Sequence, residues 1–208
     1  MVEYIGIPLG NQHSKEKLPP LSYFLFYGPE GSGKTLMIRA LAYETNAMVV
    51  DLSKDYLEKN SGELLKVMYM AFTVAKEFQP AIIFFDEMEQ LFPGKGAGKK
   101  KKSTGLAKVK KILFDMKKSP RLDKQMDRVV VIGCTNKPWE GSSADFKKFF
   151  DKKIYFPFPN YATRLKIFSD LIKKKGVHLP NNFPLSTLAY ITEGYTPRSV
   201  RTLFCPTY

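Results

Sequence analysis

Residues 24–37 read FLFYGPEGSGKTLM, so that an apolar run, a glycine-rich turn and the start of a helical pattern follow one another directly. Gly28 is followed by four residues and then by Gly33, Lys34 and Thr35. A loop with this spacing between a strand and a helix is typical of a phosphate-binding P-loop. The stretch therefore predicts a nucleotide phosphate site at the start of a helix.

The chemistry of this loop follows from its residue types. Glycines let the backbone curl so that its N–H groups point at a phosphate, and the helix beginning near Gly33 adds its positive end. Lys34 would reach the β- and γ-phosphates, and the Thr35 hydroxyl would ligate magnesium. We expect Lys34 to be exposed, with its charge serving phosphate alone. The loop predicts binding of ATP or ADP with Mg²⁺ through Gly28, Pro29, Glu30, Gly31, Ser32, Gly33, Lys34, Thr35 and Leu36.

The rest of the chain alternates between apolar runs and amphipathic segments, which is typical of a parallel sheet covered by helices. Because the runs are continuously apolar, we expect strands buried on both faces, at residues 23–27, 47–52, 81–85, 129–134 and 154–156. Helical patterns lie at residues 34–45, 61–78, 106–118, 143–150, 161–175, 184–192 and from 197 onward. The pattern predicts an α/β fold, with an αβα sandwich over residues 1–158 and a second, all-helical segment over residues 159–208.

A second group of candidate residues follows two of the predicted strands. Asp86 and Glu87 come directly after the apolar run 82–85, at the carboxyl end of a strand, where ligands bind in such sheets. Asp86 would hold magnesium through its water shell, and Glu87 would activate the attacking water as a general base. Asn136 follows the run that ends at Cys134 and would orient the same water or touch the γ-phosphate. We predict Glu87, Asn136 and Lys34 as the catalytic residues.

Five motifs together resemble a known family. GPEGSGKT (28–35), IIFFDE (82–87), CTNKPWE (134–140), FKKFFDKKIYFPFPN (146–160) and EGYTPRSV (193–200) are similar in order and spacing to an AAA+ ATPase of the AAA subgroup that includes katanin and spastin. More narrowly, FPFPNYATR with GYTPRSV resembles the IQ-motif and AAA-domain proteins of the nexin-dynein regulatory complex in cilia. The resemblance implies a P-loop NTPase sheet in the order 5-1-4-3-2, a lid after Pro159, and ATP bound between neighbouring subunits of a ring. It also implies a place in the axoneme of a cilium or flagellum.

The loop after the second predicted strand departs from the family. Members that thread polypeptides carry an aromatic residue there, in a pattern like Lys-aromatic-x-Gly-Glu. The matching stretch in this chain is residues 59–63, with Asn60 in the aromatic position and Tyr56 as the nearest aromatic residue. This argues against threading, unless the loop aligns several residues away.

Two further departures concern charged residues around the nucleotide. Lys147 and Lys148 stand where the family places arginines that reach the neighbour's γ-phosphate. Lysine lacks the planar fork of arginine, and a trans arginine is worth about 10³–10⁵ in rate, so we expect slow hydrolysis. Arg198 follows Thr196 and Pro197, which suit the start of a helix. It points either at the phosphates of its own subunit or into solvent.

The net charge of +13 comes largely from lysine clusters, at residues 99–102, 110–111, 117–118 and 173–175. The clusters are either solvated charge or a surface for an acidic protein partner, such as tubulin tails or an axonemal neighbour. Nucleic acid is disfavoured, because no aromatic residues are interleaved to stack bases. No apolar run approaches the roughly 20 residues that span a bilayer. We therefore expect no membrane association. The two cysteines indicate a reducing compartment, and we expect the cytoplasm.

Two functions remain open on this basis. In the first, the chain is a slow, Mg-dependent ATPase in a ciliary or cytoskeletal assembly, which Asp86 and Glu87 favour. In the second, it is a scaffold module that grips nucleotide with little or no hydrolysis, which Asn60, Lys147 and Lys148 favour. Because Pro206 would stop the last helix, we also expect an incomplete lid and a monomer that binds nucleotide without forming a stable ring. The protein partners expected from the resemblance are other AAA modules, in a homo- or hetero-oligomer.

Overall fold

The computed structural model describes residues 2–19, 21–53, 63–94, 104–118, 126–176, 180 and 183–204. The chain divides into two compact units. We call Met1–Tyr27 with Thr35–Tyr155 the sheet unit, and Gly28–Lys34 with Phe156–Tyr208 the lid unit. The domain boundary expected near Phe158 stays a prediction, since a compact unit is defined by contacts and a domain by independent folding.

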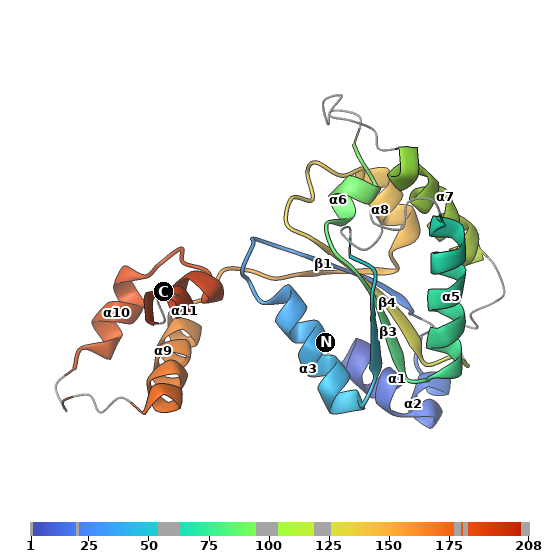
Figure 1. Ribbon diagram of the computed structural model, residues 1–208. Coiled ribbons are helices and arrows are strands. Elements are labelled where there is room, and N and C mark those ends of the chain that lie inside the picture. The colour runs from blue at the N-terminus through green and yellow to red at the C-terminus, as the bar shows by residue number, and fades with distance from the viewer. Residues whose placement is uncertain are drawn as a thin grey trace. The chain divides into compact units, whose positions relative to one another are not determined.

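Five parallel strands form one sheet in the order β2-β3-β4-β1-β5 (Figure 1). This order confirms the expected 5-1-4-3-2 arrangement, counted from the opposite edge. The strands are β1 (Tyr23–Tyr27), β2 (Met48–Asp51), β3 (Ala81–Phe85), β4 (Val129–Thr135) and β5 (Lys152–Tyr155). Two strands agree with their predicted bounds to the residue, and β5 begins two residues earlier than expected because Lys152 and Lys153 pair with Phe24 and Leu25.

Burial separates the central strands from the edge strands. Every residue of β3 and β4 is buried, as are four of the five in β1. In β2 and β5 half-buried and exposed residues alternate, so the expectation of strands buried on both faces is wrong for these two. They lie at the edges of the sheet, where a strand has one neighbour and one of its faces is left partly uncovered.

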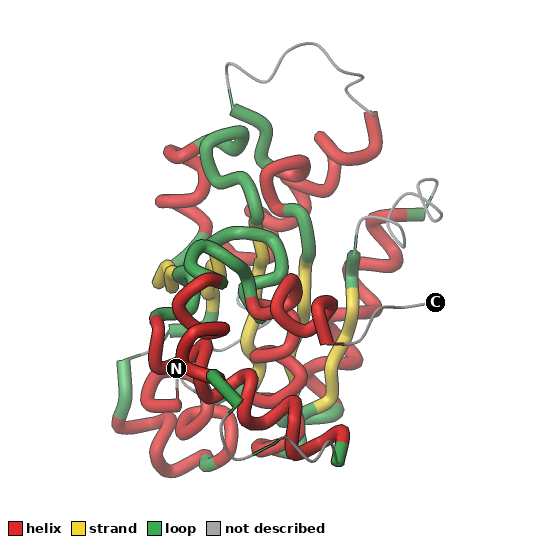
Figure 2. Tube along the Cα trace, turned by 90° about the vertical axis from the view of Figure 1, so that its left-hand side faces the viewer, coloured by secondary structure: helices red, strands yellow, loops and turns green. Residues whose placement is uncertain are grey.

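Helices cover both faces of the sheet (Figures 1 and 2). Side chains of α5, α6, α7 and α8 form one hydrophobic core with Tyr23 and Leu25 of β1 and with alternate residues of β3 and β4. Phe24 and Phe26 point to the other face, because successive strand residues alternate, and they too are fully buried. In Figure 1, α3 lies on that second side. The helices are α3 (Lys34–Thr45), α5 (Leu64–Glu77), α6 (Met88–Leu91), α7 (Thr104–Lys118) and α8 (Ser143–Phe149).

Three short helical segments precede β1 and were not predicted. They are η1 (Val2–Gly6), α1 (Ile7–Gly10) and α2 (Gln12–Lys17). Their anchors are two fully buried apolar side chains, Ile5 and Leu9, and a side-chain hydrogen bond from Gln12 to the carbonyl of Met126. Each segment is too short for a visible helical period, so only tertiary contacts reveal it.

The lid unit contains α9 (Tyr161–Lys175), α10 (Leu185–Ile191) and α11 (Pro197–Phe204) around a small core of Phe168, Ala189 and Val200. The bounds of α9 agree with the prediction because both ends carry local signals. The Asn160 side chain accepts a hydrogen bond from the Thr163 amide, and Gly176 ends the helix in the left-handed region. Pro206, on which the expected incomplete lid rests, lies outside the described residues.

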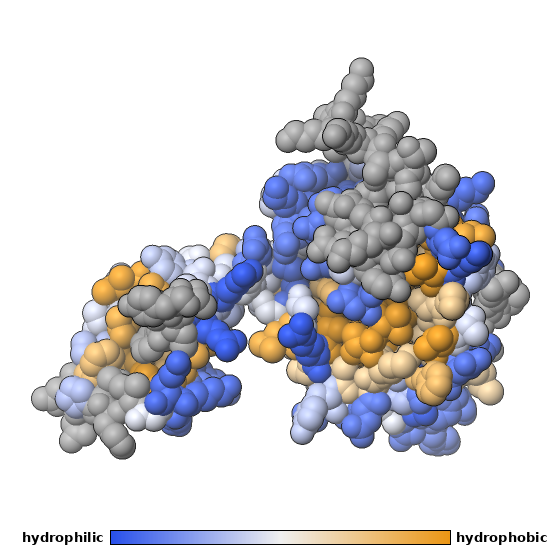
Figure 3. Space-filling view, in the orientation of Figure 1, coloured by the Kyte–Doolittle hydropathy of each residue, from blue (hydrophilic) through white to orange (hydrophobic). Residues whose placement is uncertain are grey.

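Within the described part of the chain, none of the helices is long and apolar enough to cross a bilayer. Figure 3 shows that apolar side chains gather on the surface of the sheet unit in the region of β2. The exposed apolar residues are Val49 on β2, Leu36 and Tyr43 on α3, Leu65, Met70 and Val74 on α5, and Phe78 directly after α5.

Candidate nucleotide-binding site

The loop after β1 is curled by three glycines with positive φ. Gly28, Gly31 and Gly33 have φ of 154°, 75° and 99°, which residues with a side chain rarely adopt. Two of them also pack closely against other residues of the lid unit, to which the loop belongs. A Cβ at Gly28 would lie 2.2 Å from the Phe156 carbonyl oxygen, and one at Gly31 would lie 2.7 Å from Arg198 Cβ. The glycine spacing seen in the sequence therefore has both a conformational and a packing cause.

Lys34 lies inside this loop. Its ammonium group donates to the Gly28 carbonyl at 2.9 Å, the Pro29 carbonyl at 2.8 Å and the Ser32 hydroxyl at 3.3 Å. Only 6% of the residue is exposed, so the expectation of an exposed Lys34 whose charge serves phosphate alone is wrong. The carbonyl groups of the curled loop turn toward the ammonium group and bind it. A cation held within a glycine-rich turn is a fitting cradle for an anionic ligand.

Arg198 joins the lid helix α11 to the same loop. Its guanidinium group lies 3.1 Å from the Glu30 carboxylate, and its backbone N–H donates to the Gly31 carbonyl at 3.2 Å. Thr196 caps the helix by accepting a hydrogen bond from the Ser199 amide at 3.3 Å. The side chains of Arg198 and Glu30 are 73% and 74% exposed. Sequence reasoning named both residues as nucleotide-binding candidates but had no signal for their pairing.

Thr35 and Leu36 occupy the first turn of α3, where both are exposed. Free N–H groups at such a helix start favour a bound anion. Their place agrees with the motif, in which the hydroxyl residue directly follows the lysine. The magnesium role predicted for Thr35 stays a prediction.

Asp86, Glu87 and Asn136 all lie just beyond the carboxyl ends of their strands. Phe85 of β3 pairs with Gly133 of β4, and Tyr27 of β1 pairs with Thr135 of β4. Because all these strands are parallel, their carboxyl ends lie side by side. Asp86 and Glu87 follow β3, Asn136 follows β4, and all three are half-buried. The topology thus brings two acidic groups and an amide to the carboxyl ends of the central strands, where β1 also ends.

Glu87 has an unusual backbone. It adopts the left-handed conformation with φ 50° and ψ 47°, directly before α6. Its amide donates to Asp86 Oδ1 at 2.9 Å, and its carboxylate accepts a hydrogen bond from Gln90 Nε2 at 2.5 Å. Such backbone strain is concentrated at functional sites and persists only where surrounding contacts enforce it. Gln90 was not singled out from the sequence, because its partner becomes evident only when α6 is placed.

Two buried polar atoms near this edge were also missed. Thr135 Oγ1 at the end of β4 and Glu89 Oε2 in α6 have no hydrogen-bond partner among the described residues. Thr135 is fully buried, and Glu89 is 7% exposed. Nothing in the sequence marks them, since burial of a polar side chain is a tertiary property.

Lys147 and Lys148 lie on the last turn of α8, and both are exposed. The helix leads into the first residue of β5, which pairs with Phe24 near the start of β1. The two lysines therefore lie toward the amino ends of the strands, whereas Asp86, Glu87 and Asn136 lie at the carboxyl ends. This position does not serve the same subunit's carboxyl edge and is compatible with contact to a neighbouring subunit.

Asp145, one turn earlier in α8, is held by α7. Partial burial alone would raise its pKa, but hydrogen bonds from Lys110 and Ser142 and the charges of Lys110 and Lys148 outweigh burial and lower the pKa. The Lys110 ammonium lies 2.6 Å from the Asp145 carboxylate. A lysine on α7 thus fixes the helix that carries Lys147 and Lys148.

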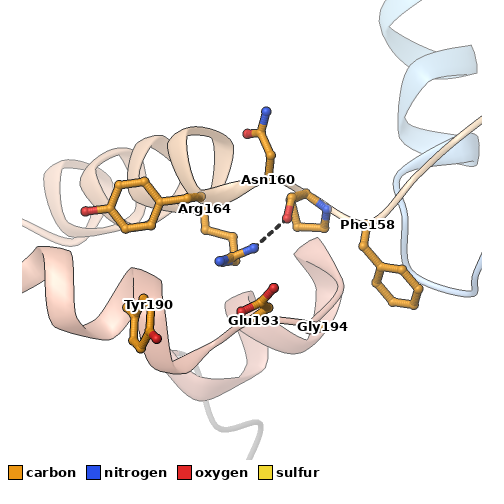
Figure 4. A pocket seen from close by; sticks show the side chains of 8 residues that line it. Phe158, Asn160, Arg164, Tyr190, Glu193 and Gly194 are labelled. Carbon is orange, nitrogen blue, oxygen red and sulfur yellow. Dashed lines mark hydrogen bonds between the residues drawn. The ribbon is translucent and has the colours of Figure 1, made fainter.

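The lid unit also contains an open pocket of about 620 Å³ (Figure 4). The guanidinium group of Arg164 donates to the Pro159 carbonyl at 2.7 Å and to the Ala189 carbonyl at 2.8 Å. These bonds join the start of α9 to α10 and leave the residue 6% exposed. The pocket is lined by Phe158, Pro159, Asn160, Tyr161, Arg164, Tyr190, Glu193 and Gly194.

Several residues named from the sequence lie outside the described part of the chain. They are Tyr56 and residues 59–62, on which the argument about threading rests, and the lysine-rich residues 95–102. Glu63, the last residue of the threading pattern, is described and lies 3.0 Å from the Lys66 ammonium group.

Comparison with known proteins agrees with this arrangement. Spastin from Xenopus tropicalis is 37% identical over 185 residues, which are 88% of this chain and 30% of that protein. Spastin from Homo sapiens is 37% identical over 178 residues, 85% of this chain and 28% of that protein. The crystal structure of the FIGL-1 AAA domain in complex with ADP matches with a TM-score of 0.76 and 26% identity, over 98% of this chain and 66% of that one.

The chain spans about 30% of the length of the spastins that it matches. The model of the ATPase family associated with various cellular activities (AAA) matches residues 24–158, which run from β1 past β5 and include the glycine-rich loop and the residues that follow β3 and β4. This match covers more than half of the sequence. The chain therefore belongs to the AAA family of ATPases.

Proposed function

We propose that this AAA ATPase module binds Mg²⁺-ATP through the loop of residues 28–34 and the start of α3, and that it hydrolyses ATP slowly. The observation that carries the proposal is the Lys34 ammonium group, which is held inside a loop of three positive-φ glycines. Binding would exchange the carbonyl oxygens around this ammonium for phosphate oxygens. The ADP named for the FIGL-1 AAA domain supports a nucleotide as the ligand.

The roles of the remaining residues follow from their chemistry. Thr35 and Asp86 supply hydroxyl and carboxylate oxygens, the ligands that Mg²⁺ prefers, and would hold the ion. When bound, Mg²⁺ would neutralise charge on the phosphates. The Glu87 carboxylate would accept a proton from the attacking water, and the Asn136 amide would orient that water.

Slow turnover is proposed because of the residues on α8. Lys147 and Lys148 are exposed and lie toward the amino ends of the strands. An ammonium group supplies charge there but cannot make the two parallel hydrogen bonds of a guanidinium group. The same observation favours the second candidate function, a module that grips nucleotide as a scaffold with little or no hydrolysis.

A phosphate-release assay on the purified chain separates these functions. For the ATPase we expect measurable Mg-dependent turnover, well below the ~1–10³ s⁻¹ that is usual for enzymes, and loss of that turnover in Glu87→Gln. Turnover that is the same in wild type and Glu87→Gln would rule out the ATPase and leave the scaffold. No binding of ATP or ADP at all would overturn both.

For partners, we propose self-association with other AAA modules and contact with an acidic protein surface, such as tubulin tails or axonemal proteins. Exposed apolar residues around β2 and the net charge of +13 support this proposal. We also propose that the protein works in a ciliary or cytoskeletal assembly in the cytoplasm. The narrower resemblance to the nexin-dynein regulatory proteins supports the ciliary setting. Co-sedimentation with microtubules, before and after removal of the acidic tubulin tails, tests the acidic partner. Equal binding to both would contradict it.

A further inference from the structure

We infer that Glu30 acts as an internal competitor of ATP, because its carboxylate binds the guanidinium group of Arg198 at the phosphate-binding loop. The inference rests on the proposed function, since it concerns regulation of the same phosphate-binding loop.

The contacts place both charges at the loop. Glu30 is the third residue of the loop, and its Oε1 lies 3.1 Å from Arg198 Nη1. The backbone N–H of Arg198 donates to the Gly31 carbonyl at 3.2 Å. The nearest heavy atom to a Cβ placed at Gly31 is Arg198 Cβ, so the base of the arginine side chain is tied to the loop whichever way its guanidinium group turns.

The chemistry of the two groups makes them competitors for one partner. A guanidinium group binds carboxylate and phosphate oxygens in the same planar geometry. With its backbone held at Gly31, Arg198 can exchange one oxyanion for another by rotating its side chain alone. The exposure of both side chains, 73% and 74%, leaves room for this rotation. ATP must therefore displace Glu30 before Arg198 can bind phosphate.

Glu30 also opposes nucleotide by charge. A carboxylate next to a polyphosphate repels it, and the repulsion grows when Arg198 turns away from Glu30 to the ligand. Replacing Glu30 with a neutral residue removes the repulsion and releases Arg198. Only the second effect requires Arg198, so the two can be separated by a double-mutant cycle.

The experiment measures ATP and ADP affinity by titration of the wild-type chain and of Glu30→Gln, Arg198→Gln and the double variant. Exposed ion pairs are weak, so we expect Glu30→Gln to tighten ATP binding about three- to fivefold. In the Arg198→Gln background the same substitution should change ATP affinity less than about twofold. The gain should be larger for ATP than for ADP, since ATP offers an additional phosphate to the released arginine.

Two controls keep the outcomes distinct. Arg201→Gln removes the same charge from an exposed position one turn further along α11, and in this background Glu30→Gln should give its full gain. Lys34→Ala tests the proposed function itself, because it should abolish binding whatever happens at Glu30.

Each result is decisive. An equal gain from Glu30→Gln with and without Arg198 would show that Glu30 acts by repulsion alone and would overturn the inference. Loss of the gain in Arg201→Gln would also overturn it, because any positive charge on α11 would then suffice. If Glu30→Gln gave no gain in ATP affinity, the ion pair would be only a solvated surface contact, and the inference would again be overturned. Failure of the wild type to bind nucleotide would instead refute the proposed function.

Discussion

The Gln90 side-chain amide donates a 2.5 Å hydrogen bond to the Glu87 carboxylate. Glu87 is the residue after Asp86 at the end of β3, and Gln90 lies in the single turn of α6 that follows. The bond spans three residues and closes over a left-handed backbone at Glu87. It holds the proposed general base in one orientation relative to the carboxyl edge of the sheet.

We predict that Gln90→Ala lowers kcat on the order of tenfold and leaves ATP affinity unchanged, because Gln90 orients the base without touching nucleotide. Steady-state phosphate release and a separate binding titration check this split. Gln12→Ala removes another glutamine side chain, which bonds to the Met126 carbonyl, and should leave kcat unchanged. A Gln90→Ala enzyme with wild-type kcat would show that Glu87 needs no such support.

Lys34→Ala should abolish nucleotide binding and also lower the free energy of unfolding. The second effect is expected because the Lys34 ammonium satisfies the Gly28 and Pro29 carbonyls, and hydrogen bonds to a charged group contribute about 1.5–3 kcal/mol each. Because water can reach the loop once the lysine is removed, we expect a net loss of roughly 1–3 kcal/mol. Urea unfolding and a nucleotide titration measure the two effects. Unchanged nucleotide affinity would remove the assignment of the phosphate loop.

Replacing Lys147 and Lys148 together by arginine should raise turnover, and the gain should grow with protein concentration. The dependence on concentration is expected because these residues lie toward the amino ends of the strands, away from Asp86 and Glu87 at the carboxyl ends. They can therefore act only on a neighbouring subunit. Phosphate release at several concentrations, with sedimentation to measure association, tests this. Lys166→Arg on α9 is the control. No gain at concentrations where the variant associates would exclude the missing-arginine explanation.

Gly31→Ala should weaken nucleotide binding more than a comparable change elsewhere. At Gly31 an added Cβ meets both a φ of 75° and Arg198 Cβ at 2.7 Å, so the loop and α11 must move apart. Gly176→Ala has the similar φ of 63° but no atom within 4 Å, and it costs only the backbone strain, about 1 kcal/mol. Thermal unfolding and ATP affinity of the two variants give the comparison. Equal effects of both on ATP affinity would mean that contact with α11 does not matter.

Tyr23 should make stability depend on pH in the alkaline range. Burial, and secondarily the Asp151 carboxylate, raise the pKa of Tyr23 from 10.0 to about 12. Because the folded pKa lies above the unfolded one, the contribution to stability is complete below pH 10 and is lost as the pH rises toward about 12. The difference in unfolding free energy between wild type and Tyr23→Phe should therefore shrink across that interval. The exposed Tyr43→Phe is the control, and a difference that stays constant with pH would contradict the prediction.

Local patterns were sufficient for the central part of the fold. The bounds of β1, β3 and α9 follow from continuous apolar runs, from Asn160 at a helix start and from Gly176 at a helix end. The edge strands were less predictable, since each has a neighbour on one side only. β2 reads MVVD and resembles a buried strand, whereas β5 reads KKIY and begins with two lysines that an apolar run does not include. The helices before β1 gave no periodic signal, because each is four to six residues long.

The sequence by itself determined the chemistry that this protein can bring to a nucleotide, because the residue types and their spacing at Gly28, Gly33, Lys34 and Thr35 are local. It also determined that Asp86, Glu87 and Asn136 leave their strands at one edge, since all strands of such a sheet run parallel. Only the tertiary structure decided that Lys34 turns into its own loop. It alone paired Glu30 with Arg198, which lie 168 positions apart in the chain. Contacts between such distant residues depend on where the chain returns to the loop, and no local pattern encodes that path.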